Sequence, residues 1–210
     1  MGIKNDNSEM LVQILFPTYL CKFKLGRDLT QTELNFLMNL PTRLNAGNVT
    51  GLDTELLENK ILSNLAEFIN SKVQYCFDEI YKPSKNVKLR ITQSWINYTK
   101  KSEYHHRHTH SNSFMSGVFY VNANKDTDKI VFHNEHYRTI DIIPRENTIL
   151  NSRNWWYPVE TGDLILFPSD LSHSVDMVNT DTIRASLAFN TFPVGYVGND
   201  VELTGLHLRD

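Results

Sequence analysis

The sequence has few cysteines, no long apolar run and no excess of basic residues. Two cysteines in 210 residues, Cys21 and Cys76, cannot form a disulfide framework, and we expect both to be reduced and buried. No apolar run reaches the roughly 18 residues that a membrane span requires. With 21 basic against 24 acidic residues, the net charge of −3 argues against a nucleic-acid-binding surface. We therefore expect neither a nucleic acid nor a membrane as a partner.

The composition is that of a globular protein, because 40% of the residues are hydrophobic and 11% are aromatic. A chain of this length predicts a single domain over residues 1–210 that can bury a sizeable core. The polar N-terminal sequence MGIKNDNSEM and the short apolar stretch LVQILF behind it do not form a secretion signal. We therefore expect a cytoplasmic protein.

Residues 1–84 are predicted to be mainly helical. Apolar side chains recur at roughly helical spacing in residues 28–44. The sequence Asp-Thr-Glu at 53–55 is typical of a capped helix start, and apolar residues follow at three- and four-residue steps as far as Tyr81. Pro83 ends this pattern. We expect a long amphipathic helix that packs on a sheet.

After the helical part, the hydrophobic pattern changes to the period of two that is typical of strands. The predicted strands are 88–98, 113–122, 129–133, 139–143, 147–151, 155–159, 163–167, 173–178 and 182–191. Many short strands behind a helical segment predict a mostly β fold. We expect a double-sheet jelly roll over residues 85–192, with the helices on one outer face and residues 193–210 as a C-terminal tail.

Four of the eight histidines lie within six residues, at positions 105, 106, 108 and 110. Neutral imidazole is a good ligand for iron, zinc, copper and nickel. Residues i and i+2 of an extended segment point to the same side, so His108 and His110 can converge on one ion. The pair His106 and His108 has the same spacing. A solvated polar loop is the competing interpretation.

Two further features lie downstream of the histidine cluster. His173 opens a strand after the bend at Pro168, and in a jelly roll it can supply the distant third ligand of a facial metal site. Arg184 and Ser186 share one face of the apolar strand IRASLAFNTF. An arginine that points into a barrel needs an anionic partner, and a carboxylate fits its planar fork. The alternative is an arginine on the solvent side of an edge strand.

Together, these features resemble the iron(II)- and 2-oxoglutarate-dependent oxygenases, which have a double-stranded β-helix fold. That superfamily carries a His-x-acid pair, a distal histidine and a downstream arginine, often as Arg-x-Ser. The chain keeps this order with His108, His110, His173, Arg184 and Ser186.

More narrowly, the chain is similar to a branch of that superfamily found in bacteria and bacteriophages. Its hallmarks are supplied in order by Trp95, His-x-His-x-Asn-Ser at 108–113, Ser-Gly-Val-x-Tyr at 116–120 and the segment 162–173. The resemblance covers roughly residues 85–192. For a phage protein, the expected location becomes the cytoplasm of the host.

The resemblance implies a hydroxylase with Fe(II) as metal and 2-oxoglutarate as co-substrate, which releases succinate and CO2. The implied metal ligands are His108, His110 and His173, and the implied co-substrate residues are Asn97, Tyr120, Arg184 and Ser186. A small molecule or a peptide is the implied substrate, with a peptide or protein side chain as the first expectation because prolyl hydroxylases are similar. The sequence leaves open whether the protein is a monomer or a homodimer.

One position departs from the superfamily pattern, because His110 stands where a carboxylate ligand is usual. Three neutral imidazoles leave Fe(II) with a charge of +2 instead of +1, which attracts a dianionic co-substrate at least as strongly. The charge that a carboxylate ligand donates is then missing. A change of register could instead bring in Glu103, Asp170 or Asp176 as an oxygen ligand.

Two other functions fit part of the pattern. A cupin-like module that binds a metal or small ligand without turnover would keep the histidines, but it would not need Arg184 and Ser186 to face inward. A zinc hydrolase would need a general base such as Glu103 near the metal. The aromatic residues 155–157 either form a rim for a binding partner or belong to a strand that packs on the helices.

Overall fold

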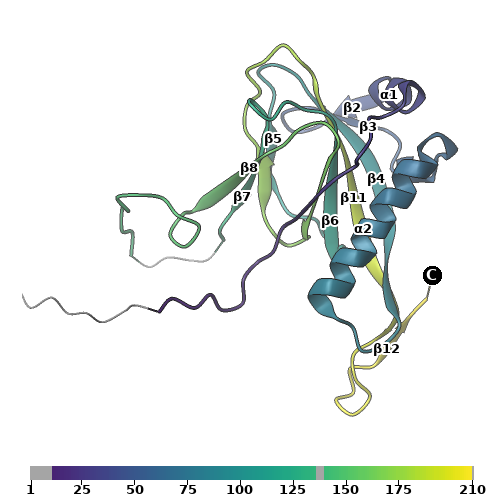
Figure 1. Cartoon of the computed structure of the whole chain (residues 1–210), viewed down its shortest axis with the longest axis vertical. Coiled ribbons are helices and arrows are strands. Elements are labelled where there is room, and N and C mark those ends of the chain that lie inside the picture. The colour runs from purple at the N-terminus through teal and green to yellow at the C-terminus, as the bar shows by residue number, and fades with distance from the viewer. Residues whose placement is uncertain (1–10, 136–139, 210) are drawn as a thin grey trace, which may run out of the picture.

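The computed structural model describes residues 11–135 and 140–209, and its core is two β-sheets that face each other (Figure 1). The larger sheet has the strand order β1 (Cys21–Lys24), β9 (Asp163–Pro168), β6 (Met115–Asn122), β11 (Arg184–Val197), β4 (Val87–Thr99), β3 (Val49–Gly51) and β2 (Thr42–Leu44), and β12 (Leu206–Leu208) pairs with β11. The smaller sheet has the order β5 (His105–His108), β10 (His173–Val175), β7 (Lys129–His133) and β8 (Asn154–Pro158). The described helical segments are α1 (Gln31–Met38), the 3-10 turns η1 (Leu56–Glu58) and η2 (Lys60–Leu62), and α2 (Ser63–Tyr81).

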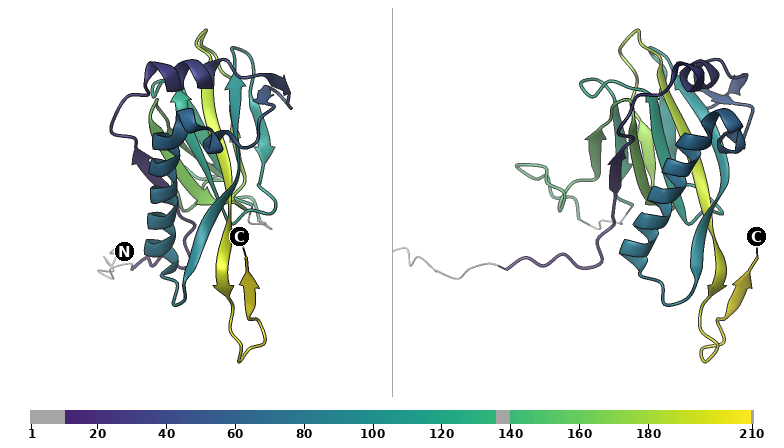
Figure 2. Two further views of the ribbon diagram at one scale, coloured as in Figure 1. Left: turned by 90° about the vertical axis from the view of Figure 1, so that its right-hand side faces the viewer. Right: turned by 45° about the vertical axis from the view of Figure 1, so that its right-hand side comes forward.

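Alternation along the strands of the larger sheet produces two separate hydrophobic clusters. Phe119 and Val121 of β6 belong to a cluster shared with α2, whereas Val118 and Tyr120 belong to a second cluster shared with the smaller sheet. Because successive side chains of a strand point to opposite faces, one strand serves both clusters. The helix α2 and the smaller sheet thus lie on opposite sides of the larger sheet (Figure 2).

The helix α2 forms because its apolar residues fall on one stripe that the sheet covers. Leu65, Ile69, Val73 and Phe77 are at most 5% exposed and pack in the cluster with the larger sheet. The helix ends at Lys82, which adopts the left-handed conformation (φ 44°) typical of a helix C-terminus.

The predicted helix over residues 53–81 is wrong in its first turns, since α2 begins at Ser63. The backbone before it is bound to β4 instead. The carbonyl of Thr54 accepts a hydrogen bond from the Ser94 amide (2.7 Å), and the Ser94 hydroxyl accepts one from the Leu57 amide (2.9 Å). These long-range bonds replace the first turns of the expected helix and hold the segment against the sheet.

Other boundaries also differ from the sequence-based expectation. Residues 140–143 and 147–151 are not strands, and position 139 lies outside the described residues. The part predicted to be helical also contains β1, β2 and β3, and the predicted C-terminal tail contains the end of β11 and the whole of β12. These short strands exist through pairing with distant partners, as in the register Cys21 to Leu166, and such pairing leaves little local signal.

Two observations bear on the expectations about cysteines and membranes. Cys21 and Cys76 are free thiols, the first half-buried and the second buried. No helix among residues 11–135 and 140–209 is long and apolar enough to cross a membrane. The N-terminal decapeptide, on which part of the location prediction depends, lies outside the described residues.

Candidate metal centre

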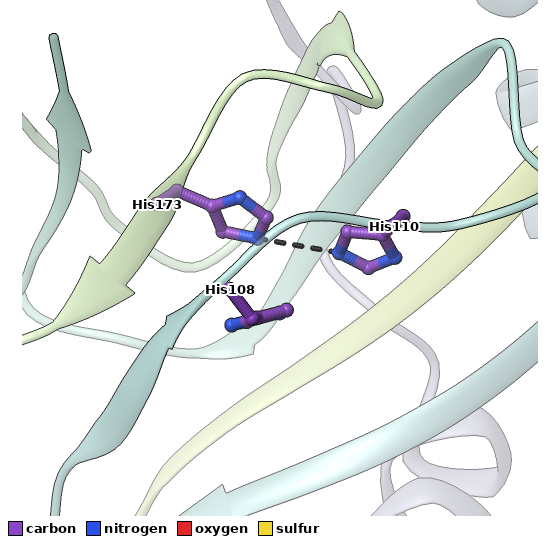
Figure 3. Close-up of side chains that lie close together, drawn as sticks. All are labelled: His108, His110 and His173. Atoms are coloured by element: carbon purple, nitrogen blue, oxygen red, sulfur yellow. Dashed lines mark hydrogen bonds between the residues drawn. The ribbon is translucent and has the colours of Figure 1, made fainter. Parts of the chain in front are cut away.

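Three histidines from two neighbouring strands of the smaller sheet converge on one point (Figure 3). His108 ends β5 and pairs in register with His173, which begins β10. His110 follows β5 and is held by a hydrogen bond from its amide to the carbonyl of Ser169 (2.9 Å). One ring nitrogen of each histidine lies within 4.8 Å of the others, and no other group of this kind occurs among the described residues.

Backbone contacts set which ring nitrogen of each histidine faces the centre. Nδ1 of His108 donates to the carbonyl of His106 (2.8 Å), and Nδ1 of His173 donates to the carbonyl of Leu171 (3.0 Å). Both rings therefore present an unprotonated Nε2. Nε2 of His110 lies 3.3 Å from Nε2 of His173. Two nitrogens bound at right angles to one ion, each about 2.1 Å from it, are about 3 Å apart, so this spacing suits a shared metal.

The environment keeps the imidazoles neutral, which is the form that binds a metal. Burial lowers the pKa of His110 to about 4, with a further decrease from His108 and a partly opposing hydrogen bond with Asn190. Burial also lowers the pKa of His108 and, more strongly, that of His173. At neutral pH the three rings therefore need not lose protons before an ion binds.

His105 is a fourth imidazole beside the centre, half-buried, and it was not among the predicted metal ligands. Its ring stacks on His108 with 4.6 Å between centroids, and it lines the same cavity. Burial and the neighbouring imidazoles lower the pKa of His105 to about 3. The ring thus packs behind a ligand as a neutral, largely desolvated neighbour.

The other end of the cavity carries polar side chains from three adjacent strands of the larger sheet. Ser186 of β11 is in register with Asn97 of β4 on one side and with Tyr120 of β6 on the other. Arg184 lies two residues before Ser186 on the same face, and all four residues are at most 4% exposed. The seven predicted site residues therefore line one cavity, with the imidazoles at one end and the guanidinium at the other.

Several polar atoms of this end have no hydrogen-bond partner within the described part of the chain. They are Nε of Arg184, the hydroxyl of Tyr120 and Oδ1 of Asn97. Arg184 also has no ion pair among the described residues, and its Cζ lies 5.1 Å from the ring centroid of Tyr120. Because the desolvation of a buried charge without a partner costs several kcal/mol, this part of the cavity suits an anionic ligand.

The hydroxyl of Tyr120 is a proton donor at every physiological pH. Burial raises the pKa of Tyr120 to about 12, and the positive charge of Arg184 opposes part of this increase. A neutral phenol beside a guanidinium can donate a hydrogen bond to a carboxylate. The donor set at this end, a guanidinium with two hydroxyls, matches a carboxylate ligand.

The carboxylates that were considered as alternative ligands lie away from the imidazoles. The side chain of Glu103 accepts a hydrogen bond from the Lys100 amide (2.8 Å), and Asp176 pairs with Lys129 (2.9 Å). Asp170 lines a different cavity. The described residues therefore favour the three-histidine set over a set with a carboxylate, and they place no general base of the zinc-hydrolase kind beside it.

Two residues that contact His110 were not predicted as site residues, although Trp95 belongs to the motifs of the resemblance. The ring of Trp95 lies over His110 with 5.8 Å between centroids. Asn190, on β11, joins His110 to a buried hydrogen-bond network through Ser116, whose hydroxyl donates to Oδ1 of Asn190 (3.0 Å). Asn190 lies four residues after Ser186, so the period of two of a strand places both on the same face. This spacing could have identified Asn190 from the sequence.

Residues 93–190 match the family model described as "Putative 2OG-Fe(II) oxygenase". The matched range contains the three converging imidazoles and the buried Arg184. A search of curated proteins by sequence found no match.

Several solved structures of such oxygenases have the same fold. HygX from Streptomyces hygroscopicus, crystallised with nickel, 2-oxoglutarate and hygromycin B, is 13% identical, with 92% of each chain covered and a TM-score of 0.59. An oxidoreductase of the 2OG-Fe(II) oxygenase family from Burkholderia pseudomallei is 14% identical, with 81% of this chain and 83% of that chain covered and a TM-score of 0.55. The α-ketoglutarate-dependent epimerase SnoN from nogalamycin biosynthesis is 12% identical, with 83% and 78% covered and a TM-score of 0.58.

SnoN has also been crystallised with Fe3+ and α-ketoglutarate. At these identities the structures show a shared fold, and the family match adds the sequence pattern of the core. Over residues 93–190 the chain is therefore similar in sequence, and over most of its length similar in fold, to oxidoreductases that use iron(II) and 2-oxoglutarate.

Proposed function

We propose that the protein is a hydroxylase in which His108, His110 and His173 hold Fe(II) through their Nε2 atoms. In this proposal, Arg184 and Ser186 bind the far carboxylate of 2-oxoglutarate. The observation that carries it is the buried, unpaired guanidinium at the end of the same cavity that the three imidazoles line. A carboxylate at that position would give Arg184 the anionic partner that its burial requires.

Iron(II), 2-oxoglutarate and dioxygen would supply the oxidation, in which one oxygen atom enters a substrate C–H bond and the other enters succinate as CO2 leaves. The chain's own residues bind and orient. Tyr120 would donate a hydrogen bond from its neutral hydroxyl to the carboxylate beside Arg184, and Asn97 lies in the same row across the strands. Since the three imidazoles are neutral, they offset none of the metal's charge, and the site attracts a dianion at both ends.

The cavity is narrow, with a volume of about 30 Å³. A five-carbon diacid therefore enters only if the lining side chains move apart. Trp95 is one of the half-buried lining residues, so its surroundings change when the cavity opens. We expect binding to change the fluorescence of Trp95.

The described residues favour an oxygenase over a cupin-like module that only holds a metal. Such a module has no use for a buried guanidinium, yet Arg184 is 2% exposed and Ser186 is 4% exposed in the metal-facing cavity. A peptide or protein side chain stays our proposal for the substrate.

The test is an anaerobic titration of the full chain with Fe(II) and 2-oxoglutarate. We expect a metal-to-ligand charge-transfer band in the visible spectrum, because chelation of the metal by the keto acid produces one. Admission of air should then release succinate. Iron binding without the band would contradict the proposal and favour the cupin-like module. A band without succinate release would show that the protein binds 2-oxoglutarate but does not turn it over.

A further inference from the structure

A second and larger cavity, of about 530 Å³, lies beside the metal centre. Its walls come from the N-terminal segment 14–20, the end of β7, the strand β8 and the loop before β10. Its lining includes aromatic side chains, leucines and two carboxylates, and five of these residues carry the argument. We call it the aromatic cleft and define it by Phe132, Trp155, Tyr157, Asp170 and Leu171.

The aromatic cleft and the metal centre share one wall of the smaller sheet. Phe132 pairs in register with His173 on one side and with Trp155 on the other. The ring centroids of Phe132 and His173 are 6.2 Å apart. Leu171 lines the cleft, and its carbonyl accepts the hydrogen bond that orients His173. A molecule in the cleft therefore contacts residues that lie directly beside a candidate metal ligand on the neighbouring strand.

The charges that line the aromatic cleft are of one sign. Among the described residues, its lining includes the carboxylates of Glu135 and Asp170 and no lysine or arginine. Glu135 is already paired with Arg107. Asp170 is exposed and has no ion pair within residues 11–135 and 140–209, so its negative charge is available to a ligand.

The aromatic rings of the cleft are also available to a ligand. Trp155 is half-buried, and no ring stacking or cation contact involves it within the described part of the chain, whereas its neighbour Trp156 on the opposite face of β8 lies under Lys129 (5.4 Å). Tyr157 contacts Phe132 edge to face, with 6.4 Å between centroids. Aromatic faces beside an unpaired carboxylate are the surroundings that favour an organic cation.

We propose that the aromatic cleft binds a peptide segment of the substrate that presents a lysine or arginine side chain to Trp155 and Asp170. The cleft's volume lies in the range that holds several residues, which is more than one cationic group needs. Its rim adds apolar side chains that are more than 60% exposed, which suit apolar neighbours of the basic residue: Ile14, Phe16, Ile149 and Leu150. As a substrate site the cleft depends on the proposed hydroxylase function, but its binding of a basic peptide does not require turnover.

The experiment measures binding of a capped pentapeptide, acetyl-Ala-Leu-Lys-Leu-Ala-amide, to the full chain by calorimetry. The comparison ligands are the same peptide with norleucine in place of lysine, and n-butylammonium alone. We expect the lysine peptide to bind about tenfold more tightly than the norleucine peptide, which is the size of a partly desolvated cation–π contact. Equal affinities for the two peptides would overturn the proposal, and butylammonium as tight as the peptide would show a site for small amines instead.

Variants locate the binding in the cleft. Trp155→Leu and Asp170→Asn should each weaken the lysine peptide about tenfold, while Trp156→Leu and Asp181→Asn, which lie outside the cleft lining, should leave it within twofold. Each variant should keep the charge-transfer band with Fe(II) and 2-oxoglutarate, which shows that the fold and the metal centre are intact. If the unmodified chain binds the peptide but gives no charge-transfer band, the proposed hydroxylase function is wrong and the proposed peptide site stands. If it gives the band but does not bind the peptide, only the proposed peptide site is wrong.

Discussion

At position 184 the chain buries a guanidinium that is 2% exposed and has no ion pair among the described residues. Replacement by methionine keeps the length of the side chain and removes the charge. We expect Arg184→Met to raise the free energy of unfolding, because the desolvation cost of an unpaired charge is lost. The same change should weaken 2-oxoglutarate binding by about 2–5 kcal/mol.

The two measurements for Arg184→Met are urea unfolding and calorimetric titration with 2-oxoglutarate. Arg184→Lys is the control that retains a charge but not the planar fork, and it should bind more tightly than the methionine variant. A destabilised methionine variant with unchanged 2-oxoglutarate affinity would mean that Arg184 serves the fold and not a ligand.

The neighbouring histidines allow a matched pair of substitutions for the metal. His110→Ala removes one of three converging nitrogens, so the affinity for Fe(II) or Zn(II) should fall by more than the ~10–100-fold typical of losing a group behind a ligand. His106→Ala is the control, because Nδ1 of His106 contacts the carbonyl of Ala46 (3.3 Å) and the ring lies outside the converging group. A larger loss in the His106 variant, measured by competition with a chelator, would assign the metal to the other histidine pair.

The residues of the site were accessible from the sequence to different degrees. His108, His110 and Arg184 stand out because imidazoles at i and i+2, or a charge in an apolar strand, are unusual in themselves. The burial of His105 and the contact of Asn190 with His110 depend on how β5 and β11 lie across the cavity. No local pattern encodes that arrangement, so these two residues needed the structure.

At the scale of the element, Gly117 in β6 shows how closely the larger sheet is packed. A Cβ atom at this position would lie 2.6 Å from Cε1 of Phe189 and 2.7 Å from Cδ2 of Leu166, on the two neighbouring strands. We therefore expect Gly117→Ala to lower the free energy of unfolding by about 1–3 kcal/mol, the usual cost of overpacking.

A double-mutant cycle with Phe189→Leu checks this cause. Since the smaller side chain makes room for the new methyl group, the double variant should lose less stability than the sum of the two single variants, as measured by urea unfolding. Additive losses would assign the effect of Gly117→Ala to the backbone and not to a clash with Phe189.

The elements that the sequence predicts well are those whose apolar residues are buried in the core. The strands β6, β9 and β11 are flanked by turns and have apolar residues on both faces, and α2 has a single buried stripe. The predicted strands at 139–143 and 147–151 failed because an apolar run such as Ile142-Ile143 implies burial, whereas both residues are more than 70% exposed. Whether an apolar run is buried depends on packing against distant segments, which the local sequence does not encode.

At the scale of the whole molecule, four neutral histidines, one buried and three half-buried, make the metal-free protein sensitive to acid. Burial lowers the pKa of His105 to about 3 and that of His110 to about 4, and it also lowers the pKa of His108 and His173. The unfolded chain binds protons on these residues below about pH 6.5, whereas the folded chain does not. The unfolded state therefore holds more protons, and the free energy of unfolding should fall as the pH decreases.

Each of the four histidines should contribute at most about 1.4 kcal/mol per pH unit to this decrease, in the window from about pH 6.5 to pH 5. Within that window the paired carboxylates contribute little, because Arg27 lowers the pKa of Glu33 and Arg107 lowers that of Glu135 below their usual range. The slope of the free energy of unfolding against pH is measured by urea unfolding of chelator-treated protein at about pH 7.5, 6.5, 5.5 and 5.0, values that span the histidine titration. His105→Gln should flatten it, the exposed His207→Ala should not, and a slope of zero in the unmodified chain would mean that folding does not lower the pKa of the four imidazoles.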